Sequence, residues 1–546
     1  MRLPRPGHGA GGAFGAWAGR EAYPTLRGRC TIGSGIMISP LTPLDFLVRS
    51  AAVFPDATAI VDGERRFTYA EFRERVLRLA SALENLGVQP GDRVAVLAPN
   101  SVAALEAHFA PLWIGAVLVM LNTRLAAPDL AWILRHCGAR VLLVDPELRH
   151  LVDHTEVPAV ISDYEGLLRS AARPPRPPVV TDENACIAIN YTSGTTGFPK
   201  GVMYTHRGAW LNAIGEIAEH QLNQRSVYLW TLPMFHCNGW CFPWAVTAAG
   251  GRHVCMRRPD PAEVLSLIEA EGVTHLCGAP VVVAALAQCC AARGVRFAGR
   301  LRIITAGAPP APAVIRAAEE AGAEITHAYG LTETYGPHTI CAWNPAWDRL
   351  PAGERAQLKA RQGVPYLVAG IGLRVADEQM RDVPADGRTM GEVLMRGNNV
   401  MLGYFANPQA TAEAFTDGWF HSGDLAVVHP DGYIEVRDRK KDIVISGGEN
   451  ISSIEVEKVL ADHPAVAEAA IVAAPDEQWG EVPVAWVSLK PGAAATAEEL
   501  IAWCRQRLAH FKCPKQVEFG ALPRTATGKV RKNELRGRAR GREAGK

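Results

Sequence analysis

Short apolar runs alternate with amphipathic helical patterns along most of this chain, and that alternation constrains the possible fold more than any other feature. "DRVAVLAPN" (92–100) and "ARVLLVD" (139–145) are typical of strands, and "SVAALEAHFAPLWIGA" (101–116) between them predicts one helix. The same order returns in "SVYLWTLP", "RHVCM", "THLCGAP" and "LRIITAGAPP", where each strand runs into a loop. We therefore expect βαβ units around parallel sheets, with ligands bound beyond the carboxyl ends of the strands.

The pattern changes near residue 390, where short β segments with turn glycines precede a helix, two strands and another helix. This predicts an α/β fold with a large N-terminal domain of parallel-type subdomains and a small, mobile α+β C-terminal domain. The first helix of the small domain is expected to be capped by Ser452 or Ser453. The expected divisions are a disordered extension at 1–37 (or a start at Met37), an N-terminal domain at 38–438, a hinge at 439–441, a C-terminal lid at 442–536 and a frayed tail at 537–546.

Composition excludes several classes of protein. Lys plus Arg number 57 and Asp plus Glu number 56, a balance that argues against a nucleic-acid partner. No apolar run reaches the roughly 20 residues that cross a bilayer. The 12 cysteines lack the paired spacing of a structural zinc site, so we expect reduced thiols and a cytoplasmic location.

The segment "YTSGTTGFPKGV" (191–202) is too rich in glycine and proline for the interior of a helix or strand. Glycine allows backbone N–H groups to face one centre, and such nests bind anions. The natural ligand is a polyphosphate, although the loop does not match the GxxxxGK[ST] pattern. The residues that supply amides, hydroxyls or charge are Thr192, Ser193, Gly194, Thr195, Thr196, Gly197 and Lys200.

This loop resembles the phosphate loop of the adenylate-forming superfamily, which contains acyl-CoA synthetases, luciferases and peptide-synthetase adenylation domains. Further motifs occur in that family's order: "YGLTET" (329–334), "WFHSGDLA" (419–426), "GYIEVRDRKKDIVISGGENIS" (432–452) and "PRTATGKV" (523–530). The resemblance covers about residues 38 to 535 and implies the fold of an acyl-CoA synthetase.

Activation of a carboxylate by ATP requires a metal ligand, phosphate contacts and a grip on the nucleoside. Glu333 is a hard oxygen ligand suited to Mg²⁺, which takes one or two carboxylates together with phosphates. Thr332 can donate to a phosphate oxygen, and Tyr329 can stack on adenine. The resemblance implies further contacts to the nucleotide and metal from Thr195, Gly307, Ala308, Pro309, Gly330, Asp424 and Arg439.

The resemblance also implies catalytic and mobile residues. Lys529 resembles the lysine that bridges the α-phosphate and the substrate carboxylate, and His236 matches a position at the entrance of the acyl pocket. Gly447 and Gly448 resemble the segment that lines the pantetheine path. Lys441 matches the pivot about which the C-terminal domain turns between the two half-reactions.

The activity implied is that of an AMP-forming acyl-CoA synthetase, an acid–thiol ligase using ATP, Mg²⁺ and coenzyme A. "LPMFHCNGW" (232–240) and the residues after "YGLTET" resemble the plant-type acyl-activating branch, which implies a short- or medium-chain, branched or small aromatic acid. The alternatives are a long-chain fatty acid–CoA ligase, an adenylation enzyme that loads a carrier protein, an inactive binding scaffold and a luciferase-type oxygenase. The expected partners are the acid and CoA, and a homodimer is left open.

Overall fold

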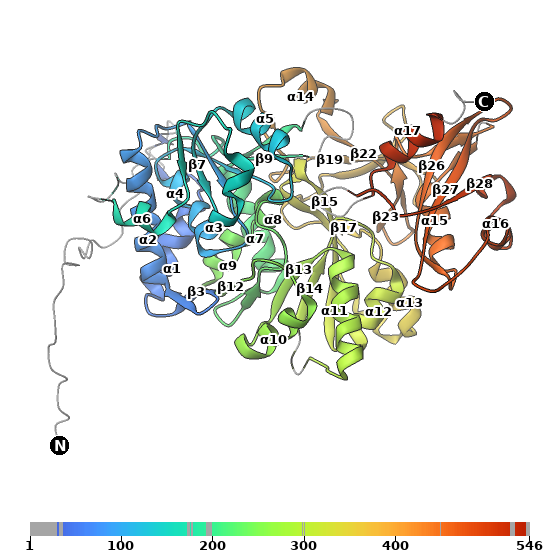
Figure 1. The fold of residues 1–546 in the computed structure, drawn as a ribbon, viewed down its shortest axis with the longest axis horizontal. Coiled ribbons are helices and arrows are strands. Elements are labelled where there is room, and N and C mark those ends of the chain that lie inside the picture. The colour runs from blue at the N-terminus through green and yellow to red at the C-terminus, as the bar shows by residue number, and fades with distance from the viewer. Residues whose placement is uncertain are drawn as a thin grey trace.

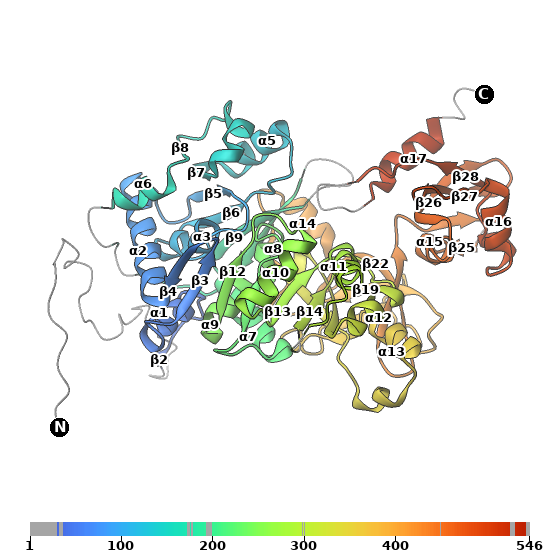
Figure 2. The same cartoon turned by 60° about the horizontal axis from the view of Figure 1, so that its bottom comes forward.

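The structure, a computed structural model, describes residues 30–31, 37–171, 175, 178, 180–192, 199–297, 299, 301–447, 449–524 and 530–541. Figure 1 shows a large body that holds most of the described chain and a smaller body formed by the last strands and helices. Figure 2 shows the same two bodies from a direction turned by 60°. The predicted fold class, a large N-terminal domain with a small C-terminal domain, is confirmed.

The first sheet of the large domain has seven described strands in the order β20-β10-β9-β6-β5-β7-β8. Its strands are β5 (Arg93–Leu97), β6 (Val117–Met120), β7 (Ala139–Val144), β8 (Ala159–Ile161), β9 (Cys186–Tyr191), β10 (Gly201–Thr205) and β20 (Gly403–Tyr404). Strands β5 to β9 are parallel, whereas β10 and β20 are added antiparallel at one edge. Its neighbouring helices are α2 (Tyr69–Asn85), α3 (Val102–Ala107), α4 (Ala110–Trp113), α5 (Ala127–Cys137) and α6 (Tyr164–Arg169).

The second sheet has nine described strands in the order β17-β16-β15-β14-β13-β11-β12-β3-β4. Its parallel centre is β3 (Thr58–Asp62), β12 (Arg252–Cys255), β11 (Val227–Leu229), β13 (His275–Gly278), β14 (Leu301–Thr305) and β15 (Ala323–Leu331). Its antiparallel edges are β4 (Arg65–Thr68), β16 (Gly336–Ile340) and β17 (Val364–Pro365). Its helices are α1 (Leu44–Val53), α7 (His206–His220), α8 (Cys237–Trp240), α9 (Phe242–Ala249), α10 (Pro261–Glu271), α11 (Pro280–Arg293), α12 (Pro312–Glu320) and α13 (Ala352–Lys359).

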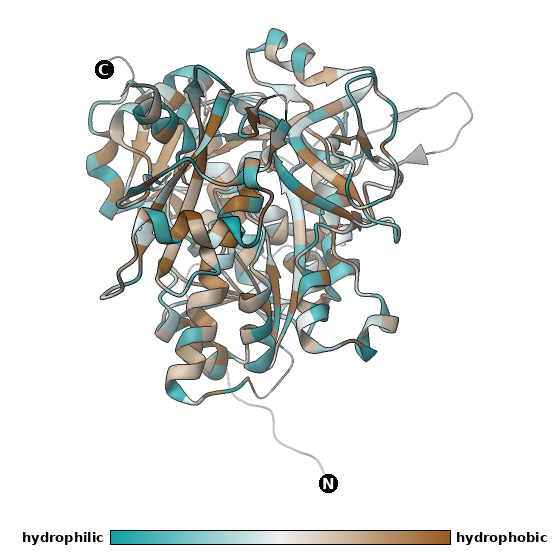
Figure 3. Ribbon diagram, turned by 90° about the vertical axis from the view of Figure 1, so that its right-hand side faces the viewer, coloured by the Kyte–Doolittle hydropathy of each residue, from teal (hydrophilic) through white to brown (hydrophobic). Residues whose placement is uncertain are grey.

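The main hydrophobic core lies between these two sheets. It joins buried residues of both sheets with those of α1, α2, α7 and α9. A second core lies under α10, α11 and α12, and a third lies under α5. Figure 3 shows hydrophobic residues concentrated in the strands and hydrophilic residues along the outer surfaces of the helices. This layering follows from alternation, because each sheet buries both faces.

The helix predicted over 101–116 is wrong as a single element. The structure divides it into α3 and α4, with a break at His108 and Phe109. Pro111 explains the break, because its ring would clash with the carbonyl of Ala107 in a continuous helix and it lacks an N–H donor.

A third, antiparallel sheet packs against the main core and precedes the small domain in the sequence. Its described strands are β18 (Leu373–Ala376), β19 (Gly391–Met395), β21 (Phe415–Thr416), β22 (Trp419–Val428) and β23 (Ile434–Arg439), with α14 (Pro408–Ala414) beside it. The small domain contains β24 (Val444–Ser446), β25 (Glu449–Ile451), α15 (Ser453–Ala461), β26 (Val466–Asp476), β27 (Gly480–Leu489), α16 (Ala497–Arg505), β28 (Gln516–Phe519) and α17 (Lys532–Gly541). Ser452 caps α15 and accepts a hydrogen bond from Glu455 N–H, as the sequence predicted.

Three further findings concern the described part of the chain. No helix there combines the length and apolar composition needed to cross a bilayer. The eleven cysteines from Cys137 to Cys513 are all free. A short ladder pairs β1 (Cys30–Thr31) with β2 (Met37–Ile38).

Candidate active site

The glycine-rich loop connects two antiparallel strands. Tyr191 at the end of β9 pairs with Gly201 at the start of β10, and Thr192 N–H donates to Lys200 O at 2.9 Å. This pairing brings the two ends of the loop together at the edge of the first sheet. Residues Ser193, Gly194, Thr195, Thr196 and Gly197 lie outside the described residues, so their phosphate contacts stay predictions.

Tyr404 joins the lysine of this loop to the predicted metal ligand. The Lys200 ammonium lies 4.7 Å from the centre of the Tyr404 ring, within range of a cation–π contact. The Tyr404 hydroxyl donates to Glu333 Oε1 at 2.8 Å. Tyr404 reaches this place because β20 pairs with β10. One phenol therefore contacts a cation with its ring and a carboxylate with its hydroxyl, although the two groups come from distant motifs.

A second tyrosine fixes the turn that carries Thr332 and Glu333. The hydroxyl of Tyr204, on β10, donates to Thr332 O at 2.7 Å. The Tyr204 ring also stacks on Tyr335, with ring centroids 3.6 Å apart. The turn itself is a short 3₁₀ helix, Thr332–Thr334, and not the start of an α-helix. These contacts attach the turn to the strand that follows the phosphate loop.

Gly330 lies at an irregularity between β15 and β16, directly before this turn. A Cβ added there would lie 1.9 Å from Gly336 O, so only glycine fits. Gly307, Ala308 and Pro309 form an exposed loop after β14, and Gly307 has φ +86°. This loop opens at the carboxyl end of the parallel strands, as the alternation predicted.

The strand end at His236 leads into an unusual backbone turn. Five consecutive residues, 237–241, have φ between +44° and +65°, and four of them carry side chains. Such left-handed conformations are costly for residues other than glycine and concentrate at functional sites. The half-buried His236 precedes this turn, and its Nδ1 lies 3.5 Å from Cys237 Sγ. Cys237 Sγ in turn lies 3.6 Å from Thr332 Oγ1.

Asp424, Tyr329 and Arg439 come together although they lie far apart in the sequence. The Tyr329 hydroxyl donates to Asp424 Oδ2 at 2.6 Å, and Arg439 Nε lies 3.5 Å from Asp424 Oδ1. Antiparallel pairing of β22 and β23 places Asp424 opposite Arg439. Burial and the neighbouring carboxylate raise the pKa of the Tyr329 hydroxyl well above its ordinary value, which keeps it a donor. Each carboxylate oxygen of Asp424 still has acceptor capacity for ligand hydroxyls.

The predicted hinge, 439–441, begins at the last residue of β23 and leads toward β24. Arg536 on α17 donates to Lys441 O at 2.8 Å and to Asp442 Oδ1 at 2.6 Å. Gly447 has φ +59°, and its N–H donates to Trp479 O at 2.8 Å. A Cβ on Gly447 would lie 2.8 Å from the Trp479 ring, so the glycine admits this close approach. Gly448 and Lys529 lie outside the described residues.

Glu333 fits the metal role that the sequence assigned to it. Its half-buried carboxylate is oriented by Tyr404, and no described residue hydrogen-bonds its Oε2. The described residues contain no group of three or more His, Cys, Asp or Glu that could hold a metal by themselves. A single carboxylate suits a Mg²⁺ ion whose other ligands are phosphates and waters.

The sequence analysis missed three residues that organise the site: Tyr204, Tyr404 and Arg536. The alternation "GVMYT" places Tyr204 on one face of β10, but nothing in the sequence indicates its contact with Thr332. Tyr404 lies in a two-residue strand, which is too short to predict. Arg536 lies in a basic C-terminal helix whose polar pattern gives no sign of a partner.

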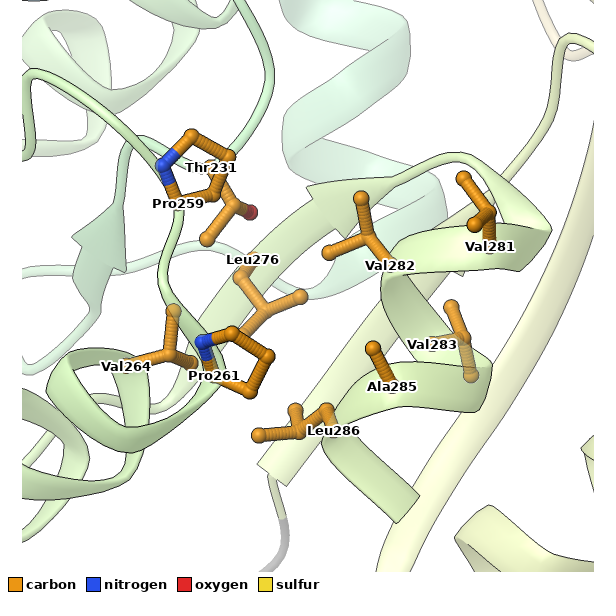
Figure 4. Close-up of a pocket in the computed structure, with 10 residues that line it drawn as sticks. All are labelled: Thr231, Pro259, Pro261, Val264, Leu276, Val281, Val282, Val283, Ala285 and Leu286. Carbon is orange, nitrogen blue, oxygen red and sulfur yellow. The ribbon is translucent and has the colours of Figure 1, made fainter. Parts of the chain in front are cut away.

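A cavity of about 220 Å³ lies between α10 and α11. Figure 4 shows its lining side chains, with Leu276 among them. Its lining is almost entirely aliphatic and includes Val264, Val282 and Leu286. Leu276 belongs to the core under α10 and α11, whereas its neighbour Cys277 belongs to the central core together with Cys237. The cavity therefore lies on the opposite face of the second sheet from the His236 turn.

Comparisons with known proteins agree with this arrangement. Residues 47–405 match the family model "AMP-binding enzyme", and residues 455–529 match "AMP-binding enzyme C-terminal domain". A 4-hydroxybutyrate–CoA ligase from Metallosphaera sedula is 46% identical over 529 residues, covering 93% of this chain and 96% of that protein. A peroxisomal acetate/butyrate–CoA ligase from Arabidopsis thaliana is 44% identical, covering 92% of this chain and 95% of that protein.

A solved structure of o-succinylbenzoate CoA synthetase from Bacillus subtilis, in complex with its acyl-adenylate intermediate, has a TM-score of 0.80 at 28% identity. The match covers 91% of this chain and 98% of that one. A second structure of that enzyme, with ATP and a magnesium ion, has a TM-score of 0.78 at 28% identity and covers 90% of this chain and 98% of that one.

Proposed function

The chain belongs to the AMP-binding enzyme family, and we propose from this premise that it is an AMP-forming acyl-CoA synthetase for short- or medium-chain, branched or small aromatic acids. ATP and the acid give an acyl-adenylate and pyrophosphate, and the CoA thiol then displaces AMP. Relatives named for acetate, butyrate and 4-hydroxybutyrate support the choice of small acids.

One observation carries the proposal: two tyrosines attach the phosphate-loop hairpin to the turn of Thr332 and Glu333. Tyr204 holds Thr332 O, and Tyr404 holds the Glu333 carboxylate while its ring lies near Lys200. The nucleoside cluster of Asp424 lies on strands that continue into the hinge. Tyr329, which donates to Asp424, lies on β15 just before the Thr332–Thr334 turn, and this supports a single site for the proposed phosphate, metal and ribose contacts.

The roles proposed for the chain's own residues rest on their types and on the family resemblance, and this geometry supports them. Lys200 and Thr332 bind the phosphates, and Asp424 accepts the ribose hydroxyls beside Arg439. Glu333 would hold Mg²⁺, which neutralises phosphate charge when bound. His236 orients the acid at the pocket entrance. The proposed roles of the loop residues 193–197 and of Lys529, which bridges the α-phosphate and the carboxylate, rest on the family resemblance.

An acid panel scored by CoA-dependent AMP release tests the activity. Butyrate and benzoate should give a kcat/KM at least about tenfold above that of palmitate, a difference of about 1.4 kcal/mol in activation free energy. ATP–pyrophosphate exchange measured without CoA checks adenylation separately. Palmitate as the best substrate would establish the long-chain alternative, and transfer to a carrier protein in preference to CoA would establish the carrier-loading one. No exchange with any acid would indicate a scaffold.

Substituting Glu333 by glutamine should raise the Mg²⁺ concentration needed for half-maximal activity by about tenfold or more, because the side chain keeps its shape and loses its charge. Tyr404→Phe should raise it less, since it removes only the hydrogen bond that orients the carboxylate. Glu354→Gln, an exposed carboxylate on α13, is the matched control. A magnesium titration that is the same for Glu333→Gln and this control would assign Glu333 a structural role.

Location and assembly belong to the proposal as well. We place the enzyme in the cytoplasm and allow for a homodimer, although the Arabidopsis relative is named as peroxisomal. Cell fractionation and size-exclusion chromatography with light scattering measure these two properties directly.

A further inference from the structure

Several buried polar atoms lie unpaired on the core side of the proposed site. In the described part of the chain, Asn212 Oδ1, Glu216 Oε1 and the Tyr335 hydroxyl are buried and make no hydrogen bond. The equally buried Tyr228 hydroxyl lies beside the thiol of Cys277, which is a weak hydrogen-bonding group. The side-chain oxygen and nitrogen of Asn238, in the turn after His236, are also buried and make no hydrogen bond. A buried polar group without a partner costs about 1–3 kcal/mol, so such groups in a native structure point to something that binds them.

The contacts of these residues place them in one cluster beside the proposed site. We define the α7 cluster as Asn212, Glu216, Tyr228 and Tyr335. Asn212 Nδ2 donates to Tyr335 O at 2.9 Å, and Tyr335 follows the Thr332–Thr334 turn directly. Asn212 and Glu216 are four residues apart on α7, so their side chains lie on the same face of the helix. Burial and the neighbouring Cys277 raise the pKa of the Tyr228 hydroxyl, and Glu216 is close enough to add to this shift.

The cluster extends inward from the site by about one helical turn, roughly 5.4 Å. Asn212 Nδ2 also lies 3.3 Å from the sulfur of Cys241, the last residue of the left-handed turn that follows His236. At the inner end, Tyr366 donates to Glu216 Oε2 at 2.8 Å, which leaves Oε1 as the unpaired oxygen. The cluster thus begins between the turns of His236 and Glu333 and runs toward the core.

We propose that the α7 cluster binds a hydroxyl group on the acyl chain, so that the preferred substrates are short-chain acids with a hydroxyl distant from the carboxylate. This inference rests on the proposed acyl-CoA synthetase activity and adds the class of acid. Asn212 Oδ1 accepts hydrogen bonds and cannot donate them. Glu216 Oε1 does the same when the glutamate is ionised, and the Tyr228 hydroxyl can donate one. A hydroxyl donates and accepts at once, which satisfies both kinds of group.

Other acyl groups satisfy the cluster less well. A plain alkyl chain leaves the buried acceptors unpaired, and sites built to hydrogen-bond a hydroxyl discriminate strongly against analogues that lack it. A second carboxylate would face Glu216, which is itself fully buried. The rival occupant is an ordered water molecule, because buried waters commonly satisfy such groups.

The test compares 4-hydroxybutyrate with butyrate in the full-length enzyme, using CoA-dependent AMP release. The wild type should show kcat/KM at least about tenfold higher for 4-hydroxybutyrate, as expected for one buried hydrogen bond. Tyr228→Phe removes a hydroxyl that lies beside the Cys277 thiol, a weak partner, so it should bring this ratio down severalfold with little change in the melting temperature. Glu216→Gln should lower the ratio as well.

Tyr69→Phe is the matched control, because Tyr69 is equally buried but its hydroxyl donates to Gly251 O, away from the cluster. It should lower the melting temperature and leave the substrate ratio unchanged.

A wild-type ratio near one, or a ratio that Tyr228→Phe does not alter, would overturn the inference and assign the cluster to bound water. A preference for 4-aminobutyrate over 4-hydroxybutyrate would overturn the assigned class. If no acid is activated, the proposed function fails together with the inference; if butyrate is activated equally well, only the inference fails.

Discussion

Replacing Asp424 by alanine should reduce kcat/KM for ATP by about 10²-fold or more. Hydrogen bonds to a charged group contribute about 1.5–3 kcal/mol each, and the variant loses two proposed bonds to the ribose. It also leaves the Tyr329 hydroxyl without its 2.6 Å partner. The measurement is the ATP dependence of pyrophosphate exchange at a saturating concentration of the acid.

Two further variants separate nucleotide binding from folding. Asp431→Ala removes an exposed carboxylate from the turn between β22 and β23, where it pairs with Arg361 at 2.9 Å, and should leave the ATP dependence unchanged. Tyr329→Phe keeps the Asp424 carboxylate and should cost much less than Asp424→Ala. If Asp424→Ala lowers the melting temperature but not the affinity for ATP, the carboxylate only supports the packing of β22 against β15.

Lys441→Pro should separate the two half-reactions. Adenylation, measured by ATP–pyrophosphate exchange, should stay within about tenfold of the wild type, whereas thioester formation should fall by roughly 10²-fold, or about 2.7 kcal/mol. Proline fixes φ near −65° and restricts the residue before it, so it opposes a change of backbone conformation at the hinge. Lys441→Ala keeps both dihedrals free and should support both half-reactions.

The structure identifies contacts that a turn of the small domain would have to break. Ser452 Oγ donates to Arg437 O at 2.6 Å, and Ser453 Oγ donates to Asp438 Oδ1 at 3.0 Å. Arg536 belongs to the small domain and would move with Asp442, so its contact with Asp442 can persist. Full activity of Lys441→Pro in both half-reactions would show that Lys441 is not the pivot. Loss of adenylation alone would show that the proline holds the opposite arrangement.

The sequence alone determined the fold class and the residue types of the proposed site. Alternating strands and helices left few folds open, because parallel strands need helical crossovers and bind ligands at their carboxyl ends. The composition of the loop at 191–202 predicted an anion as its ligand, because a segment so rich in glycine and hydroxyls is suited to little else. Local patterns also predicted the cap of α15 at Ser452. The single helix expected over 101–116 failed because Pro111 divides it, a breaker visible in the sequence.

Only the tertiary structure decided which side chains meet. Tyr329 and Asp424 are 95 residues apart, and the β15 and β22 strands that carry them belong to different sheets, so no local pattern could pair them. Tyr404 reaches Glu333 through a two-residue strand at the edge of the first sheet. The unpaired atoms of Asn212 and Glu216 give no signal in the sequence, where both are ordinary polar residues of a helix. Their meaning depends on burial and on the absence of a partner, and both arise only when distant segments pack together.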